Sequence, residues 1–357
     1  MEYTRRREQL AKRLQQRGVD ALLVTHLPNV RYLSGFTGSH AAVLATSRAV
    51  VLLTDGRYAD QAKNETAGLH VVITSGEGLL RVAADRVRSL ELARLGFEAT
   101  MSYSAFTHLA GMLEPTELVA THGIVEGLRM RKDPDEAAAL LRAQACTDAA
   151  FDRATAFLRK GITEREAALE LEIAMRRAGA DDVAFASIVA FGENAAEPHH
   201  APTERVLASG DVVKMDFGAR VDGYHADMTR TVEMGEAAGE LQTIHDVVLA
   251  AHEAGVASLT AGCRAGEPEA AARTVVEQAG YGQRWMHPPG HGVGLEIHEA
   301  PVLRRDDSTL IPAGAMITIE PGIYVPGLGG VRIEDIIHVT EDGPVPLPSA
   351  TKQLLRL

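Results

Sequence analysis

The sequence predicts an α+β protein of two domains, a smaller α/β domain followed by a larger domain built mostly on antiparallel strands. Its 357 residues exceed the roughly 150 residues of a typical domain, so we expect about two. Helix and strand patterns alternate in the first third, whereas strand patterns dominate from Val183 onward. We therefore place the first domain at residues 1–125 and the second at residues 126–357.

The first domain begins with a helix, Arg5–Arg17, which Gly18 ends. An Asp55-Gly56 turn precedes a second, polar helix over Tyr58–Glu65. The domain carries no glycine-rich phosphate loop and no nucleophile elbow, so we expect it to supply no chemistry of its own. Short apolar runs predict five buried strands: Ala21–Thr25, Ala41–Thr46, Val50–Thr54, Val71–Thr74 and Leu95–Glu98.

The second domain opens with helices whose start signals are complete. Asp133 is an N-cap, followed by Pro134 in the first turn and Glu136 at the third helical position. Thr163 and Glu166 form the capping box of the next helix. The predicted helices are Asp135–Leu158, Glu164–Ala178, Leu241–Thr260 and Pro268–Ala279.

Composition and charge exclude several classes of function. The chain holds 48 acidic and 36 basic residues, a net charge of −12 that repels phosphate backbones, so we expect no nucleic-acid partner. No apolar run approaches the roughly 20 residues that span a bilayer, and the start, Arg5–Arg7, lacks the apolar segment of a secretory signal. Cys146 and Cys263 stand outside any C-x-x-C pattern, so we expect packing roles and a reducing, cytoplasmic compartment.

Two aspartates are expected on one hairpin of the second domain. Asp216 ends an apolar strand, and an Asp222-Gly223 turn leads into a return strand over Tyr224–Val232 that carries Asp227. A two-residue turn pairs Asp216 with Thr229, which makes Asp227 a diagonal neighbour of Asp216 on the same face. Two carboxylates on one face repel, so solvent, a basic partner or a cation must offset the repulsion.

Three further residues favour the cation. His291 lies in a glycine-rich loop, where the backbone can approach a ligand closely. Glu320 ends a predicted strand that starts at Met316, and Glu334 lies inside a predicted strand over Val331–Val339. Acidic residues within apolar β-rich runs are disfavoured by propensity and by burial. Several such residues together with a histidine indicate a shared cation.

The charge count indicates two cations. Four carboxylates carry a charge of about −4, which two divalent ions would balance. Oxygen ligands with one imidazole suit Mn²⁺, Co²⁺ or Zn²⁺. Two such ions roughly 3.5–4 Å apart acidify a bridging water and polarise a carbonyl, which is typical of a hydrolase.

The sequence resembles a known family at these same positions. The order Asp216, Asp227, His291, Glu320 and Glu334 is similar to the ligand set of the pita-bread metallopeptidases, family M24, which include methionine aminopeptidases, Xaa-Pro aminopeptidases and prolidases. The resemblance extends to the sequence segments around these residues, MDFGARVDGYHADMTRT, HPPGHGVGLEIHEAP, ITIEPGIY and VRIEDIIHV. The first 120 residues, with NVRYLSGFTGS and TDGRYADQA, resemble the creatinase-like N-terminal domain of the prolidase and Xaa-Pro aminopeptidase branch. The resemblance implies a C-terminal pita-bread catalytic domain behind that smaller α/β domain.

The resemblance also implies a role for each ligand. Asp227 and Glu334 would bridge the two ions, Asp216 would bind one of them, and His291 and Glu320 would bind the other. Glu320 would in addition carry a proton from the bridging water to the leaving imino nitrogen, as a general base and then a general acid.

Further site residues follow from the family words. In GENAAEPHHAPT the family has a histidine directly after the proline, which favours His199 as the residue that hydrogen-bonds substrate or oxyanion and leaves His200 as the alternative. His298 would stabilise the tetrahedral intermediate, and His287 would line the substrate pocket. Arg332 would orient a ligand carboxylate or the substrate terminus.

The substrate implied by the resemblance is a small peptide with proline in second position. Prolyl bonds need a dedicated enzyme because the imino nitrogen has no N–H and the ring fixes φ. The N-terminal domain counts against a methionine aminopeptidase, and the modest length favours a prolidase that cleaves Xaa-Pro dipeptides. The alternatives are an Xaa-Pro aminopeptidase acting on longer peptides and a non-enzymatic binding protein on the same scaffold. A homodimer is the family expectation.

Overall fold

The computed structural model describes residues 2–66 and 68–357, and the chain divides into two compact units, Met1–Arg129 and Met130–Leu357. The short helix α6 (Glu126–Arg129) belongs to the first unit, because the amide of Asn29 bonds both Glu126 and Arg129. The boundary predicted between residues 125 and 126 falls at the first residue of this helix.

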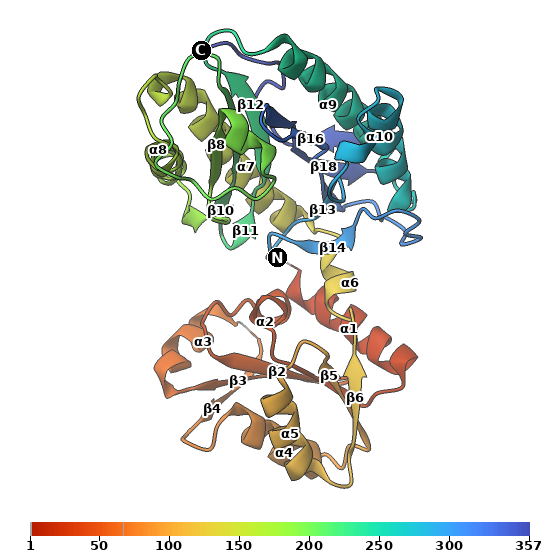
Figure 1. Ribbon diagram of the computed structural model, residues 1–357. Coiled ribbons are helices and arrows are strands. Elements are labelled where there is room, and N and C mark those ends of the chain that lie inside the picture. Colours follow the sequence, from red (N-terminus) through yellow and green to blue (C-terminus); the bar gives the residue numbers. More distant parts are fainter. Residues whose placement is uncertain (1, 67) are drawn as a thin grey trace. The chain divides into compact units, whose positions relative to one another are not determined.

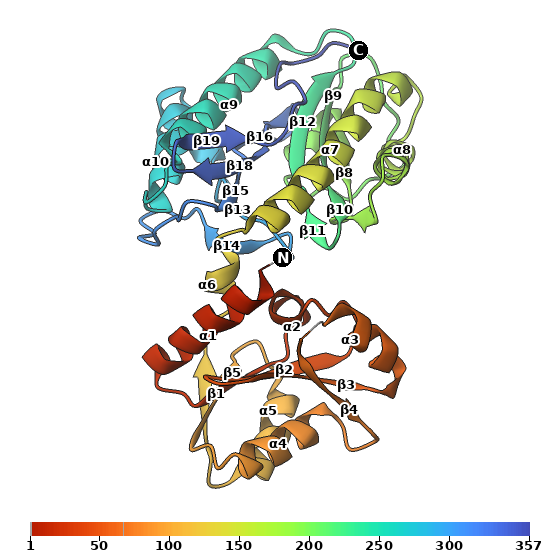
Figure 2. The same cartoon turned by 180° about the vertical axis from the view of Figure 1, so that it is seen from behind.

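The first unit is a six-stranded mixed sheet in the order β4-β3-β2-β1-β5-β6. Strands β1, β5 and β6 run parallel, as do β3 and β4, whereas β2 is antiparallel to both of its neighbours. Helices α1 and α2 lie on one face, and α4 and α5 lie on the other (Figures 1 and 2). The elements are α1 Tyr3–Arg17, β1 Ala21–Val24, α2 Leu27–Ser34, β2 Ala41–Thr46, β3 Val50–Asp55, a 3₁₀ turn Gly56–Tyr58, α3 Ala59–Glu65, β4 His70–Thr74, α4 Leu79–Ser89, β5 Arg94–Glu98, α5 Tyr103–Leu113 and β6 Glu117–Thr121.

The five strands predicted for this unit are confirmed, and so is the first helix with Gly18 in the left-handed conformation at its end. The prediction missed helices α2, α4 and α5 and strand β6. Helices α2 and α4 have no side-chain N-cap, so the usual start signal is absent from their sequences. They form because their apolar residues pack on the sheet, as Ala83, Ala84 and Val87 do in the core beneath β1–β3.

The second unit contains two helix pairs, and each pair packs against antiparallel strands (Figure 1). Helix α8 packs with α7 and against β8, and α10 packs with α9, which contacts β15–β17. Both predicted capping boxes are formed, Asp133 with Glu136 and Thr163 with Glu166. The helices are α7 Pro134–Phe157, α8 Glu164–Arg177, α9 Gly239–Ser258 and α10 Gly266–Gln278, with 3₁₀ helices at Gly192–Ala196 and Gly282–Arg284.

The strands of the second unit form four small sheets, in the orders β11-β10-β7, β12-β9-β8, β14-β13-β15-β18-β19 and β16-β17. Every pairing between these strands is antiparallel, as the sequence predicts. The strands are β7 Asp182–Val183, β8 Ile188–Phe191, β9 Val212–Phe217, β10 Ala219–Val221, β11 Tyr224–His225, β12 Met228–Glu233, β13 His291–Gly292, β14 Glu299–Val302, β15 Met316–Ile319, β16 Gly322–Val325, β17 Gly329–Arg332, β18 Asp335–Thr340 and β19 Gly343–Pro346.

Two strands predicted as continuous are interrupted. The run Tyr224–Val232 breaks at Asp227, because β11 pairs with β10 whereas β12 pairs with β9. The run Val331–Val339 breaks at Glu334, because β17 pairs with β16 whereas β18 pairs with β15. The chain therefore changes sheets at both acidic residues. The predicted pairing of Asp216 with Thr229 is confirmed.

Other sequence-based predictions are also resolved by the fold. Cys146 and Cys263 are free, buried thiols, as expected of packing residues. Among residues 2–66 and 68–357, no helix is both long and apolar enough to cross a bilayer.

The change of sheet at Asp227 depends on a glycine. A Cβ at Gly218 would collide with the carbonyl oxygen of Ala226, next to Asp227. Replacing Gly218 by alanine should therefore lower the free energy of unfolding by about 1–3 kcal/mol, measured by chemical denaturation. Gly239→Ala is the matched control, because a Cβ there meets nothing within 4 Å and should be neutral or stabilise by up to about 1 kcal/mol. Equal stabilities for the two variants would contradict this account.

Candidate metal centre

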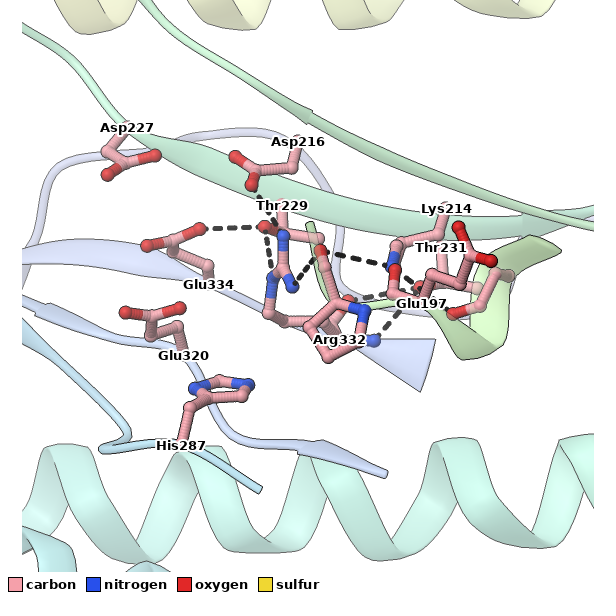
Figure 3. Close-up of polar contacts among 12 residues, drawn as sticks. Glu197, Lys214, Asp216, Asp227, Thr229, Thr231, His287, Glu320, Arg332 and Glu334 are labelled. Atoms are coloured by element: carbon pink, nitrogen blue, oxygen red, sulfur yellow. Dashed lines mark hydrogen bonds and ion pairs between the residues drawn. The ribbon is translucent and has the colours of Figure 1, made fainter. Parts of the chain in front are cut away.

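The structure brings the five predicted ligands into one largely buried cluster in the second unit. Figure 3 shows the four carboxylates among them, Asp216, Asp227, Glu320 and Glu334. Each comes from a place where a strand ends or the chain changes sheets. Asp216 lies on β9 and Asp227 immediately precedes β12. His291 begins β13, Glu320 follows β15, and Glu334 lies between β17 and β18.

The distances in the cluster suit shared cations. Asp227, His291 and Glu334 each offer one ligand atom, and these atoms lie within 4.8 Å of one another. Nε2 of His291 lies 3.6 Å from Oδ2 of Asp227 and 3.5 Å from Oε1 of Glu320. Asp216 is close enough for its charge to raise the pKa of Asp227, Glu320 and Glu334.

Burial and mutual repulsion dominate the electrostatics of the carboxylates. Burial raises the pKa of Asp227 well above its usual range, and the charges of Glu334, Asp216 and Glu320 raise it further. The pKa of Glu334 rises for the same two reasons. Burial also raises the pKa of Glu320 to about 8. Nearby cations would remove the cost of ionising these groups, so the cluster is built to hold positive charge.

His291 presents a free nitrogen to this cluster. Its Nδ1 lies 3.0 Å from the carbonyl oxygen of Gly292, which fixes the proton on Nδ1. Burial lowers the pKa of His291 to about 4, so the ring is neutral near pH 7. The lone pair of Nε2 therefore faces Asp227 and Glu320 and is available to a metal ion.

One oxygen of Asp216 supplies a further test of metal binding. Oδ2 accepts a hydrogen bond from Nη2 of Arg332 at 2.5 Å, whereas Oδ1 is buried and has no hydrogen-bond partner among the residues that the structure describes. A buried carboxylate oxygen without a donor is unfavourable unless a cation is nearby. The donor set, with four carboxylates and one imidazole, therefore fits hard or borderline divalent ions.

Arg332 connects the ligands to one another. Besides Asp216, its guanidinium donates to Oγ1 of Thr229, to the hydroxyl of Tyr324 and to the carbonyl oxygen of Pro198. Oγ1 of Thr229 in turn donates to Oε2 of Glu334 at 2.7 Å. Arg332 thus holds the carboxylate of Asp216 in place, and both of its predicted roles, toward a ligand carboxylate or toward the substrate terminus, stay predictions.

Glycines around His291 allow the backbone to pack closely, as predicted for this loop. A Cβ at Gly290 would collide with the carbonyl oxygen of Thr318, and one at Gly292 would collide with that of Ala300. The short strand β13 can therefore lie between β14 and β15, and His291 begins it.

The two adjacent histidines have different environments. His200 is buried, with Nε2 2.8 Å from Oε2 of Glu164 and Nδ1 2.6 Å from Oε2 of Glu197. Both ring nitrogens of His200 thus have partners within the chain, and its predicted role toward substrate stays a prediction. His199 is exposed. Its charge helps to lower the pKa of His287, so His199 lies near that ring, at the edge of the cluster.

Two other predicted histidines border the cluster. The ring of His298 contacts that of His291 edge to face, with centroids 4.4 Å apart. Nε2 of His287 lies 2.9 Å from the hydroxyl of Tyr324. Burial, with the nearby charge of Arg332, lowers the pKa of His287 to about 4, so this ring is neutral.

Sequence reasoning missed three residues of this network: Thr229, Tyr324 and Lys214. Lys214 is fully buried on β9 and donates hydrogen bonds to backbone carbonyls of the segment that leads to His199. Burial, with the charge of Arg332, lowers its pKa to about 6. The sequence does contain a signal for Lys214. It is a lysine inside the apolar run of β9, and because it stands two residues from Asp216, the two side chains share one face of the strand.

Comparison with known proteins identifies the family. Residues 138–341 match the model of metallopeptidase family M24, and residues 6–131 match the creatinase/prolidase N-terminal domain. The chain belongs to metallopeptidase family M24. The two matched regions confirm the predicted architecture of an M24 catalytic domain preceded by a creatinase-like domain.

Several M24 relatives are similar over their whole length. An Xaa-Pro dipeptidase of Pyrococcus furiosus is 32% identical over 98% of this chain and 99% of its own. The solved structure of an Xaa-Pro dipeptidase from Bacillus anthracis superposes with a TM-score of 0.97 at 38% identity and covers all of both chains. The structure of an X-Pro aminopeptidase from Thermotoga maritima has a TM-score of 0.89 at 33% identity and covers 97% of this chain and 100% of its own.

The contribution of Glu320 to the stability of the metal-free protein should fall as pH rises. Glu320 has a pKa of about 8 when folded and 4.5 ordinarily, so the folded state binds a proton that the unfolded chain releases, and its contribution is lost between these values. Lys214, with a folded pKa of about 6 against 10.5 ordinarily, contributes in the opposite direction over this range, so the measurement is the difference between the wild type and Glu320→Gln. Calorimetry of the chelated proteins from pH 6.5 to 8.5 should show the wild-type Tm falling relative to that of Glu320→Gln.

Added Mn²⁺ should raise the Tm by more at pH 8 than at pH 6.5, because protons compete with the ion for the same oxygens. Glu320→Gln is the matched variant, and its metal-free Tm should fall less steeply with pH. A metal-free wild-type Tm that does not fall relative to that of Glu320→Gln over this range would contradict the electrostatic account.

Proposed function

We propose that this M24 member is a two-metal peptidase that hydrolyses Xaa-Pro dipeptides. The observation that carries the proposal is the buried cluster of Asp216, Asp227, His291, Glu320 and Glu334, with raised carboxyl pKa values and an imidazole nitrogen facing the carboxylates. Relatives named Xaa-Pro dipeptidase, similar over their whole length, support the choice of substrate.

Two divalent ions would share two of the five ligands in this arrangement, and the other three would each hold one ion. Asp227 and Glu334 would bridge the ions, Asp216 would hold one, and His291 and Glu320 would hold the other. When bound, such ions lower the pKa of water and polarise the scissile carbonyl. Mn²⁺, Zn²⁺ and Co²⁺ all suit this donor set.

The chain's own residues would carry the proton and hold the substrate. Glu320 would accept a proton from the attacking water and donate it to the leaving imino nitrogen. His199 and His298 would donate hydrogen bonds to the developing oxyanion. His287 would line the pocket, held in place by Tyr324. Arg332 would keep Asp216 oriented.

An Xaa-Pro aminopeptidase is the second candidate. The observation in its favour is the 33% identity to the X-Pro aminopeptidase of Thermotoga maritima, over nearly the whole chain. The two activities differ in substrate length alone, because both release the residue before proline.

Two further expectations rest on the family resemblance and the composition. We propose that the protein is a homodimer, which light scattering would test, and that it acts in the cytoplasm. Free buried thiols at Cys146 and Cys263 are in keeping with a reducing compartment.

The proposal predicts faster turnover of Ala-Pro than of an Ala-Pro-Xaa peptide, and only in the presence of a divalent ion. The assay compares kcat/KM for the two substrates after chelation and after addition of Mn²⁺, Zn²⁺ or Co²⁺. Glu320→Gln should retain less than about 1% of wild-type kcat. Preference for the longer peptide would indicate the aminopeptidase, and metal-independent or absent turnover of both would overturn the proposal.

The neighbouring histidines predict opposite effects. His199→Ala should lower kcat/KM about 10²- to 10³-fold with no loss of stability, because the side chain is exposed and donates to the oxyanion. His200→Ala should instead lower the free energy of unfolding by about 1–3 kcal/mol, because it removes a buried partner of Glu164. Kinetics and denaturant titration of both variants test this. A larger loss of kcat/KM in stably folded His200→Ala would reverse the assignment.

A further inference from the structure

Lys214 is a fully buried basic side chain beside the proposed metal centre. It lies on β9 two residues before Asp216, so both side chains extend from the same face of the strand. Figure 3 shows the carboxylates of Asp216, Asp227, Glu320 and Glu334 on one side of Arg332 and the amino group of Lys214 on the other. The hydrogen bonds of Lys214 therefore go to other acceptors than the ligand carboxylates.

The amino group of Lys214 donates to the segment that ends at His199. Its Nζ lies within hydrogen-bond distance of the carbonyl oxygens of Ala195 at 3.2 Å, of Pro198 at 3.4 Å and of Glu197. These three backbone acceptors surround the nitrogen. Nζ also lies above the ring of Tyr324, 5.1 Å from its centroid.

The same segment is bonded to the metal centre through Arg332. The carbonyl oxygen of Pro198 also accepts from Nη1 of Arg332 at 3.1 Å, and Nη2 of that guanidinium binds Asp216. The peptide group between Pro198 and His199 is therefore held by two donors, Lys214 on β9 and Arg332 on β17. Through them the backbone of His199 is held in a set position relative to a ligand carboxylate.

We propose that Lys214 is a positioning residue that sets the place of His199 relative to the reacting centre. The inference rests on the proposed function, in which His199 donates to the oxyanion. Lys214 itself has no contact with substrate in this account and acts through the backbone of residues 195–198. An error of about 1 Å in a donor can cost roughly a hundredfold in rate, so loss of the anchor should be visible in kcat.

The test compares Lys214→Met, which keeps the length of the side chain and removes its donors, with the wild type. We expect kcat for Ala-Pro to fall about 10- to 100-fold with a change in KM of less than about threefold. In a His199→Ala background the same substitution should lower kcat by less than about threefold, because the residue through which it acts is gone. Equal losses in both backgrounds would overturn the proposal.

A second measurement does not depend on activity. Amide hydrogen exchange of the metal-free protein should be at least about tenfold faster at residues 195–200 in Lys214→Met. Lys132→Met is the matched control, since Lys132 is equally buried but pairs with Glu299, and it should leave exchange at residues 195–200 unchanged. Unchanged exchange in Lys214→Met would overturn the anchoring role, whether or not the wild type cleaves prolyl peptides.

Two arms separate the possible failures. If the wild type shows no prolyl turnover, the proposed function fails, and the exchange result alone decides whether Lys214 anchors the segment. If Lys214→Met does not fold, Lys214→Arg, which keeps donors, takes its place. It should then show a smaller loss of kcat that again disappears in the His199→Ala background. Persistence of that loss would overturn the proposal.

Discussion

Repulsion among four clustered carboxylates, three of them buried, is the constraint on which the second unit depends. Asp216, Asp227, Glu320 and Glu334 lie within reach of one another's charge, and a single guanidinium, that of Arg332, touches one of them. One positive charge cannot balance four negative ones in a poorly solvated site. The fold therefore holds these groups together at a cost in free energy that bound cations would offset.

The backbone meets this constraint because regular strand pairing is interrupted at or next to several of the ligand residues. Asp227 and Glu334 lie at changes of sheet, Glu320 directly follows a strand, and His291 begins a two-residue strand between glycines. Side chains at such places are free of the strict alternation that governs residues within a sheet. Residues separated by more than a hundred positions can therefore direct their polar ends to one point.

Local rules in the sequence predicted a large part of this arrangement. The capping boxes at Asp133 and Thr163 and the pairing of Asp216 with Thr229 depend on neighbours a few residues away, and the structure contains them. The interruptions at Asp227 and Glu334, and the partners of Lys214, depend on distant segments that no local pattern reports. His199 and His200 show the limit of prediction from local sequence. They are adjacent residues of the same type, and only the tertiary partners of their rings distinguish them.

The separation between the two units has a consequence for protein engineering. All five proposed donors, and the Arg332 network that supports them, come from residues after Met130. A chimera that exchanges residues 1–129 for the equivalent part of a relative would leave every donor atom in its native sequence context. Such hybrids offer a modular way to ask how much of the substrate choice resides in the N-terminal part, with the chemistry held constant.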